Sequence, residues 1–275
     1  MPQAKVNGVH LHYRFDGPED GIPVMLSNSL FSCLDMWDPQ MDALVSAGYR
    51  VLRYDSRGHG RSDAPEAPYS IEMLADDLAC LMDAVGWERA HFCGLSKGGM
   101  VGQVMGTRHP ERLLSLTLCD TSAYMGGPVD VWEPRIQTGL AEGVAGLVET
   151  SVERWFMAES RTRIPDQVEK VRVMIRETPL AGFLGCCRAF QAFDQRESNR
   201  SITTPTLVIV GEFDPGTDRS HARVIQDAIE GAELVIIEGA AHLTNIERPE
   251  IFNEALLGFL GRVVSRRPTS PLLDT

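Results

Sequence analysis

Ser96 stands in the sequence G-L-S-K-G, with glycines two residues before and two residues after it. The apolar run H-F-C precedes this G-x-S-x-G pattern, and a segment of helical character follows it. A sharp turn from a strand into a helix leaves little room, and Gly94 and Gly98 fit it because they lack a Cβ atom. Such a turn exposes the Ser96 hydroxyl near a helix N-terminus, where it could attack a carbonyl carbon. Alone, the pattern is equally consistent with an ordinary strand–helix turn.

A serine nucleophile needs a general base, and histidine has a suitable pKa for that role. Of the seven histidines, His242 follows the last predicted strand, in the small-residue loop E-G-A-A-H-L. His59, in R-Y-D-S-R-G-H-G-R-S, is the competing candidate, but that glycine-rich stretch is more typical of a structural loop. We therefore predict that His242 is the base.

The histidine in turn needs an acid that orients it and stabilises its charged form. Asp214 follows the run T-L-V-I-V-G, and Asp120 follows L-S-L-T-L-C, so both come at the end of a predicted strand. Asp218 would lie one helical turn further on, as a charge at a helix N-terminus. The order serine, acid, histidine is typical of triads on α/β-hydrolase sheets and favours Asp214. Asp120 remains the alternative acid.

Alternating strands and helices must position these side chains. This alternation predicts βαβ units, and therefore a mostly parallel, twisted sheet flanked by helices. Strands are predicted at residues 23–28, 50–55, 91–94, 114–120, 205–211 and 232–238, after a hairpin at 6–15 that turns at Asn7-Gly8. Helices are predicted at 37–47, 71–85, 97–108, 217–230 and 249–263, and Ser70 is the expected N-cap of the second.

Residues 123–200 interrupt this pattern, because they contain four helical segments and no convincing strand. The helices are expected at 131–141, 144–156, 166–177 and 180–194. We predict an α/β core of residues 1–122 and 201–265, a helical cap of residues 123–200 inserted after the sixth strand, and a C-terminal tail at 266–275. Such an insertion would cover the carboxyl ends of the strands, where open α/β sheets bind ligands.

Composition and charge narrow the range of partners. The formal net charge is −12, so neither a nucleic acid nor an anionic membrane surface is an expected partner. The sequence shows no signal-peptide pattern and no bilayer-length apolar run, from which we expect a cytoplasmic protein. We expect it to be a monomer or a homodimer. The six cysteines have no metal-ligand or disulfide-framework spacing, and H-E-x-x-H is absent. We therefore expect reduced thiols, no metal and no cofactor.

Nearly the whole chain resembles the α/β-hydrolase family and, within it, the 3-oxoadipate enol-lactonases of aromatic catabolism. The motifs that carry the resemblance are L-S-N-S-L, M-W-D-P-Q, V-L-R-Y-D-S-R-G-H-G-R-S, G-L-S-K-G-G-M, V-W-E-P-R-I, E-R-W-F and G-A-A-H-L-T-N-I-E-R-P. The resemblance implies the α/β-hydrolase fold and a lactonase of the β-ketoadipate pathway. It also implies an oxyanion hole formed by the backbone N–H groups of Leu30 and Lys97.

Some residues depart from the family pattern near the expected pocket. Lys97 replaces an apolar residue, and Phe31 stands where a small glycine is expected. Two interpretations of Lys97 remain open: an exposed lysine at a helix start, or a cation that recognises a substrate carboxylate or tunes the nucleophile. Trp132 and Trp155 are better explained by packing than by ligand contact. Trp132 is nevertheless kept as a candidate substrate contact. The candidate substrate contacts are Phe31, Trp132, Arg135 and Arg188.

These features together predict the hydrolysis of a small, carboxylate-bearing lactone or ester through a Ser-His-Asp triad and an acyl-enzyme. A carboxylesterase, a C–C bond hydrolase or an acyltransferase could use the same triad, and the pocket and the acyl acceptor would decide between them. A protein of another class, a ligand receptor on a hydrolase scaffold, would show at most one slow acylation event.

Overall fold

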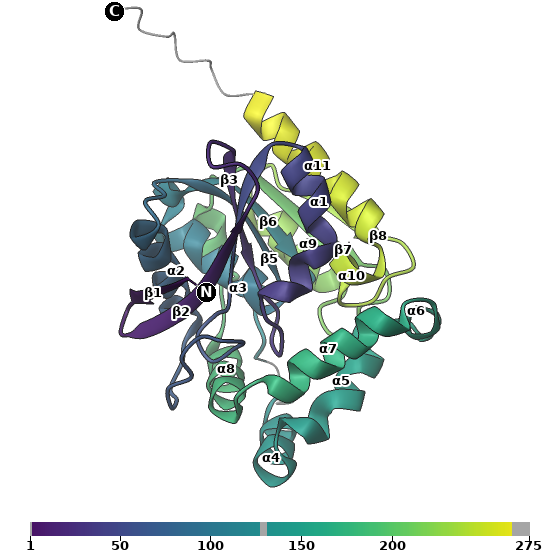
Figure 1. Ribbon diagram of the computed structural model, residues 1–275. Coiled ribbons are helices and arrows are strands. Elements are labelled where there is room, and N and C mark those ends of the chain that lie inside the picture. The colour runs from purple at the N-terminus through teal and green to yellow at the C-terminus, as the bar shows by residue number, and fades with distance from the viewer. Residues whose placement is uncertain (1, 127–130, 266–275) are drawn as a thin grey trace, which may run out of the picture.

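The computed structural model describes residues 2–126 and 131–265, so the predicted tail at 266–275 lies outside the described residues. An eight-stranded sheet in the order β1-β2-β4-β3-β5-β6-β7-β8 forms its centre (Figure 1). β1 and β2 pair antiparallel, as do β2 and β4, and all other neighbours are parallel. The strands are β1 (Gln3–Val6), β2 (Val9–Asp16), β3 (Ile22–Ser27), β4 (Tyr49–Tyr54), β5 (Ala90–Leu95), β6 (Leu113–Cys119), β7 (Thr206–Gly211) and β8 (Glu233–Ile237).

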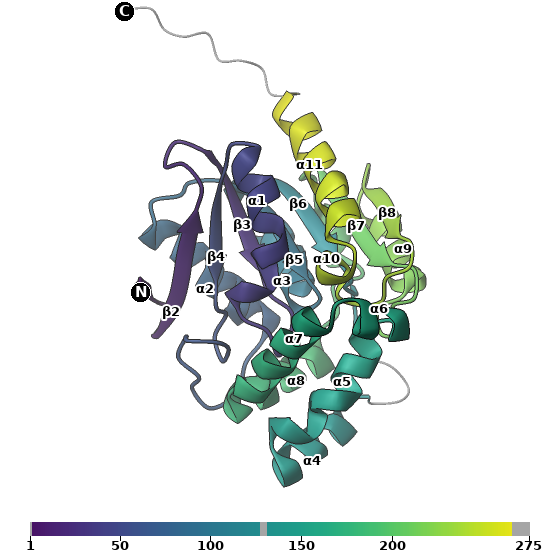
Figure 2. The same cartoon turned by 45° about the vertical axis from the view of Figure 1, so that its right-hand side comes forward.

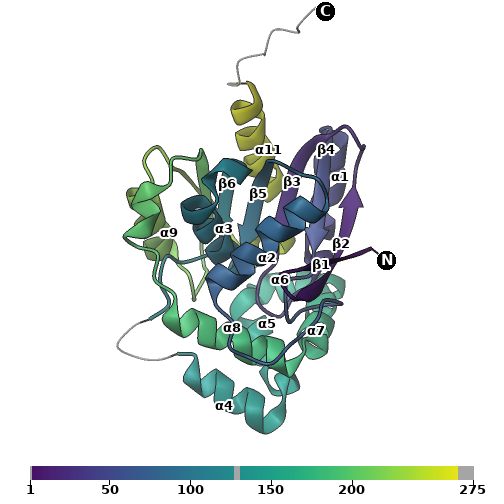
Figure 3. The same cartoon turned by 90° about the vertical axis from the view of Figure 1, so that its left-hand side faces the viewer.

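Helices cover both faces of the sheet. Figure 2 shows α1 (Asp38–Ser46) and α11 (Pro249–Ser265) on one face, and Figure 3 shows α2 (Ile71–Ala84), α3 (Lys97–Arg108) and α9 (Arg219–Ala228) on the other. α2 begins at the predicted cap, because the Ser70 hydroxyl accepts the backbone N–H of Met73 at 3.1 Å. The predicted fold class is therefore confirmed. No described helix is long and apolar enough to cross a bilayer.

Five helices lie below the sheet in Figure 1, at the carboxyl ends of the parallel strands. They are α4 (Glu133–Glu142), α5 (Val148–Trp155), α6 (Ala158–Arg163), α7 (Pro165–Glu177) and α8 (Leu180–Ala192). The predicted helix at 144–156 begins as a short 3₁₀ turn, Val144–Leu147, before α5. The sequence prediction missed two short helices, α6 and α10 (Thr244–Glu247).

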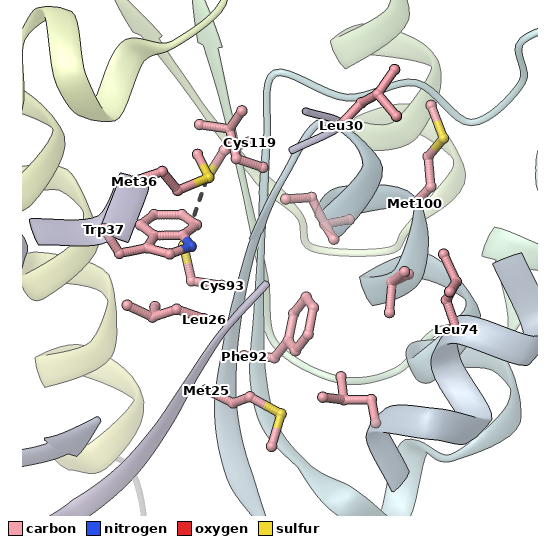
Figure 4. Packing of buried hydrophobic residues seen from close by; sticks show 14 of the residues in the cluster. Met25, Leu26, Leu30, Met36, Trp37, Leu74, Phe92, Cys93, Met100 and Cys119 are labelled. Carbon is pink, nitrogen blue, oxygen red and sulfur yellow. Dashed lines mark hydrogen bonds between the residues drawn. The ribbon is translucent and has the colours of Figure 1, made fainter. Parts of the chain in front are cut away.

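The central strands β5, β6 and β7 are buried on both faces, and successive side chains along a strand point to opposite sides of the sheet. Met25 and Phe92 point to the α2 and α3 side, whereas Leu26 and Cys93 point to the side of Trp37 (Figure 4). All six cysteines are free thiols, and four of them are buried. These include Cys93 and Cys119, whose sulfur atoms lie 3.8 Å apart (Figure 4). The rigid double-sided packing fixes the strand ends that carry the site.

Candidate active site

Ser96, Asp214 and His242 come from three different strand ends and line one cavity of about 190 Å³. Ser96 follows β5, Asp214 follows β7, and His242 follows β8. In a parallel sheet these carboxyl ends meet at one edge, which is why residues far apart in sequence share the cavity. Further lining residues are Leu30, Met100, Trp132, Arg135, Arg154 and Trp155.

Ser96 occupies a strained turn between β5 and α3. Its φ of 57° and ψ of −112° lie outside the regions that residues with a Cβ atom prefer. The turn is held because the Ser96 N–H donates to the carbonyl oxygen of Cys119 at 2.8 Å. It also requires glycines: a Cβ on Gly94 would lie 2.3 Å from the Gly98 oxygen, and a Cβ on Gly98 would lie 2.1 Å from the Ser27 oxygen. The glycines therefore have the spatial role expected from the sequence.

Asp214 and His242 form a buried hydrogen-bonded pair. His242 Nδ1 lies 2.7 Å from Asp214 Oδ2, and the side chains are 8% and 1% exposed. Asp214 also accepts from the Thr217 hydroxyl at 2.7 Å and from the Gly216 N–H at 2.8 Å. Burial alone would raise the pKa of Asp214, but the charge and hydrogen bond of His242 and the Thr217 donors hold it well below its ordinary value. An ionised acid thus fixes the imidazole with Nε2 pointing away from it.

Asp120, the alternative acid, is hydrogen-bonded elsewhere. Its Oδ1 accepts the Gly211 N–H at 2.8 Å, and its Oδ2 accepts the Thr244 hydroxyl at 2.5 Å. Burial, together with the negative charge of Asp214, raises the pKa of Asp120 well above its ordinary value. Asp120 therefore ties the end of β7 to the start of α10 and is not the partner of His242.

Two other histidines can be compared with His242. The competing candidate His59 is fully buried, its Nδ1 lies 3.2 Å from the Arg57 carbonyl oxygen, and it does not line the Ser96 cavity. His12 forms a second histidine–aspartate pair with Asp55, at 2.8 Å, but this pair lines a separate cavity of about 550 Å³. Among the described residues, only His242 combines an acid partner with a position in the cavity of Ser96.

Leu30 and Lys97 are the residues whose backbone N–H groups were predicted to form the oxyanion hole. Leu30 follows β3 and lines the cavity, and Lys97 is the first residue of α3. The first N–H groups of a helix have no acceptor within the helix. Within residues 2–126 and 131–265, neither N–H donates a hydrogen bond to another residue. Both backbone N–H groups are therefore available to donate a hydrogen bond to a substrate oxygen.

The position of the Lys97 side chain bears on the exposed-lysine interpretation and on carboxylate recognition, and leaves tuning of the nucleophile as a prediction. This side chain is 1% exposed, so the prediction of an exposed lysine is wrong. Nor does it line the cavity as a carboxylate-binding group would, because its Nζ donates to the Ser56 hydroxyl oxygen, away from the lining residues.

The cap arginines differ in their positions. Arg135 lines the cavity, and its Nη2 donates to the Ser151 hydroxyl at 3.1 Å, while its Nε has no hydrogen-bond partner within the described chain. Burial, followed by the positive charge of Arg154, lowers the pKa of Arg135. Arg154, which the sequence analysis missed, lines the same cavity. Arg188 does not line it: its half-exposed side chain pairs with Glu133 at 2.7 Å, so the prediction of a substrate contact there is wrong.

Aromatic side chains separate the cavity from the interior. Phe31 is fully buried and stacks on Phe183 at 4.8 Å, so it acts as packing behind the cavity rather than as one of its lining residues. Trp132 lines the cavity and packs against Phe190 at 4.7 Å. Trp155, expected only to pack, also lines the cavity, and its ring stacks against that of His242 with 6.1 Å between centroids and 28° between the ring planes. The motif E-R-W-F contained both Arg154 and Trp155 and was the signal that could have identified them.

The described residues contain no group of three or more histidine, cysteine or acidic side chains that could hold a metal ion. The chemistry available at this edge is therefore that of a serine hydroxyl, an imidazole paired with a carboxylate, free backbone N–H donors and two arginines.

Comparison with known proteins gives a consistent result. The family model described as alpha/beta hydrolase fold matches residues 22–249. A 3-oxoadipate enol-lactonase of Acinetobacter baylyi is 36% identical over 92% of this chain and 94% of its own length. The crystal structure of the enol-lactonase from Burkholderia xenovorans LB400 is 42% identical, covers 94% of this chain and 100% of its own, and superposes with a TM-score of 0.91. A candidate carbamate hydrolase of Variovorax paradoxus is 32% identical over 92% of this chain and 97% of its own.

Proposed function

Because the chain belongs to the alpha/beta hydrolase fold family, we propose that it opens a small, carboxylate-bearing lactone or ester with Ser96 as nucleophile, His242 as base and Asp214 as acid. The observation that carries this proposal is the shared cavity: a strained serine at a helix start faces the same space as a histidine whose Nδ1 is fixed by a buried carboxylate. Ser-His-Asp enzymes use this combination of groups for nucleophilic acyl transfer.

In the proposed mechanism, His242 Nε2 takes the Ser96 proton as the serine oxygen attacks the carbonyl carbon. The ring C–O bond then breaks, the leaving oxygen takes the proton from His242, and the opened chain stays bound to Ser96 as an acyl-enzyme. If that leaving group is an enol, it tautomerises to a ketone. A water molecule next gives a proton to His242 and attacks the acyl carbon. Release of the acid returns a proton to Ser96, and Asp214 stabilises the charged imidazole in both steps.

The negative charge of each tetrahedral intermediate would be held by the backbone N–H groups of Leu30 and Lys97. Loss of one such donor typically costs about 3–4 kcal/mol of transition-state stabilisation.

The substrate class follows from size and charge. A cavity of about 190 Å³ suits a small acyl group, and Arg135 and Arg154 provide positive charge for a substrate carboxylate. A guanidinium can bind a carboxylate in bidentate geometry, and both arginines line this cavity. The enol-lactonase relatives support an enol-lactone such as that of 3-oxoadipate as the substrate.

The test is a turnover panel containing a carboxylate-bearing lactone, a neutral lactone, p-nitrophenyl butyrate and a carbamate, assayed with wild type and with Ser96→Ala. We expect multiple turnovers, with the carboxylate-bearing lactone preferred in kcat/KM, and a loss of at least about 10³-fold in Ser96→Ala. Full activity in Ser96→Ala would overturn the mechanism. A single slow acylation without turnover would instead identify a receptor.

A further inference from the structure

Lys97 is the one buried lysine in this chain. The sequence contains lysines at positions 5, 97 and 170. Lys5 and Lys170 are exposed, whereas Lys97 is 1% exposed and directly follows Ser96. An interior ammonium group is unfavourable unless it is well paired, because burial removes its hydration. A charge placed at such a cost beside the proposed nucleophile points to a role in the reaction.

The groups around the Lys97 ammonium do not neutralise it. Nζ donates to the Ser56 hydroxyl oxygen and lies 3.5 Å from His59 Nδ1, and Lys97 forms no ion pair with another described residue. Cys186 of α8 and Asp55 are the further titratable groups that act on it. Burial lowers the pKa of Lys97 and raises that of Cys186. Burial also lowers the pKa of His59, and the positive charge of Lys97 lowers it further. The imidazole and the thiol therefore remain uncharged near neutral pH, and Asp55 is the acidic group in the surroundings.

The contacts of Lys97 join the start of α3 to the underside of the cap. Ser56 and His59 belong to the segment that follows β4. This segment touches cap helix α8, because a Cβ atom on Gly58 would lie 2.5 Å from the Gly182 Cα. The Lys97 side chain thus connects three elements that surround the nucleophile turn without entering the cavity.

We propose that Lys97 is a positioning residue: its protonated side chain, held by Ser56, fixes the first turn of α3, so that the Lys97 backbone N–H meets the negative charge that develops beside Ser96. This inference rests on the proposed function. The side chain acts through the helix start and through its positive charge, which is weakly screened in the interior. Deprotonation of Nζ removes that charge and weakens the bond to Ser56, so the protonated form is the active one.

The wild-type enzyme tests the charge dependence without any substitution. In protein labelled with ¹⁵N-lysine, the three side-chain amines can be titrated separately by NMR, with p-nitrophenyl butyrate turnover measured across the same pH range and corrected for spontaneous hydrolysis. We expect Lys97 to titrate below Lys5 and Lys170, and kcat to fall on the alkaline side with the Lys97 midpoint while KM stays constant. A kcat that stays level through the Lys97 titration would overturn the proposal.

Variants then separate this role from a merely structural one. We expect Lys97→Met to lower kcat by about 10- to 100-fold, to leave KM within about twofold and to abolish the alkaline fall. Ser56→Ala should have a smaller effect, and the double variant should be no worse than Lys97→Met, because both act through one contact. Lys170→Met is the matched control for loss of a lysine charge and should behave as wild type, and melting curves verify folding.

Failure of the positioning proposal and failure of the proposed function give different results. If Lys97→Met keeps both the wild-type kcat and its alkaline fall while Ser96→Ala is inactive, the positioning proposal is wrong and the proposed function stands. If Ser96→Ala is active, the proposed function itself is wrong, and the positioning proposal that rests on it is overturned with it.

Discussion

Asp214 and Asp120 both lie buried at the carboxyl edge of the sheet, yet their pKa values move in opposite directions. Burial acts to raise both pKa values. For Asp214, His242 and the Thr217 donors outweigh this effect, whereas Asp120 has no cationic partner among the described residues and is affected by the negative charge of Asp214. One carboxyl is thus kept ionised and the other is favoured in its protonated form. This difference in ionisation favours Asp214 over Asp120 as the acid of the proposed triad.

We expect Asp214→Asn to lower kcat by about 10³- to 10⁴-fold, because the amide can present its NH₂ to His242 Nδ1 and select the wrong tautomer. Asp120→Asn should stay within about threefold of wild type, because an amide closely replaces a protonated carboxyl and can still accept the Gly211 N–H. Steady-state kinetics at pH 7 measures both. A large loss in Asp120→Asn with normal turnover in Asp214→Asn would reassign the acid.

Acid stability should also depend on Asp214. Because its folded-state pKa lies below that of the unfolded chain, about 3.9, its stabilising contribution is complete above about pH 5 and is lost as the pH falls towards the folded pKa. The contribution of Asp120 to stability depends on pH in the opposite direction. Because its pKa is raised in the folded state, this contribution is complete below the unfolded-state pKa and declines as the pH rises towards the folded-state pKa. Urea unfolding of wild type and Asp214→Asn should show a difference in unfolding free energy that narrows from pH 7 to pH 3. A constant difference would exclude the linkage.

At the scale of elements, the turn from β5 into α3 depends on the absence of a Cβ atom. We expect Gly98→Ala to destabilise the fold by at least about 2–3 kcal/mol and to abolish activity, because its Cβ would lie 2.1 Å from the Ser27 oxygen. Gly261→Ala in α11 is the matched control, since a Cβ there meets no atom within 4 Å. It should stabilise by about 0.5–1 kcal/mol. Chemical denaturation compares the two, and equal effects would show that the turn is not tightly packed.

The sequence predicted these elements well where local signals were strong. Asn7 and Gly8 both have positive φ, as the hairpin prediction requires, and Ser70 caps α2. The short helices α6 and α10 were missed because four- to six-residue helices carry too little periodicity to recognise. Their ends are set instead by tertiary contacts, such as the Thr244 hydroxyl on Asp120.

At the scale of the whole molecule, the cavity exists only because cap and core close on each other. α4 and α5, which lie below the sheet in Figure 1, contain Arg135 and Arg154, while Ser96, Asp214 and His242 follow strands of the sheet. Strand-end placement made the core residues predictable. The cap residues were predictable only in part. Arg135 and Trp132 line the cavity as expected, but helix periodicity alone does not tell which arginine turns inward, and Arg188 pairs with Glu133 at the surface.

Removal of the cap charge should change specificity and leave the chemistry intact. We expect Arg135→Met to raise KM for a carboxylate-bearing lactone by about 10- to 100-fold, corresponding to about 1.4–2.8 kcal/mol of lost charge-assisted bonding, and to leave a neutral ester within about twofold. Arg188→Met is the matched surface control and should change neither substrate. Equal effects of Arg135→Met on both substrates would contradict carboxylate recognition.

Covalent capture tests the central claim most directly. The enzyme is quenched with acid during turnover of p-nitrophenyl butyrate, and the digested protein is analysed by mass spectrometry. The proposed mechanism predicts a butyryl group on the peptide that contains Ser96, at Ser96 itself, and no butyryl group in Ser96→Ala. An acyl group on another residue, or undiminished turnover in Ser96→Ala, would contradict it.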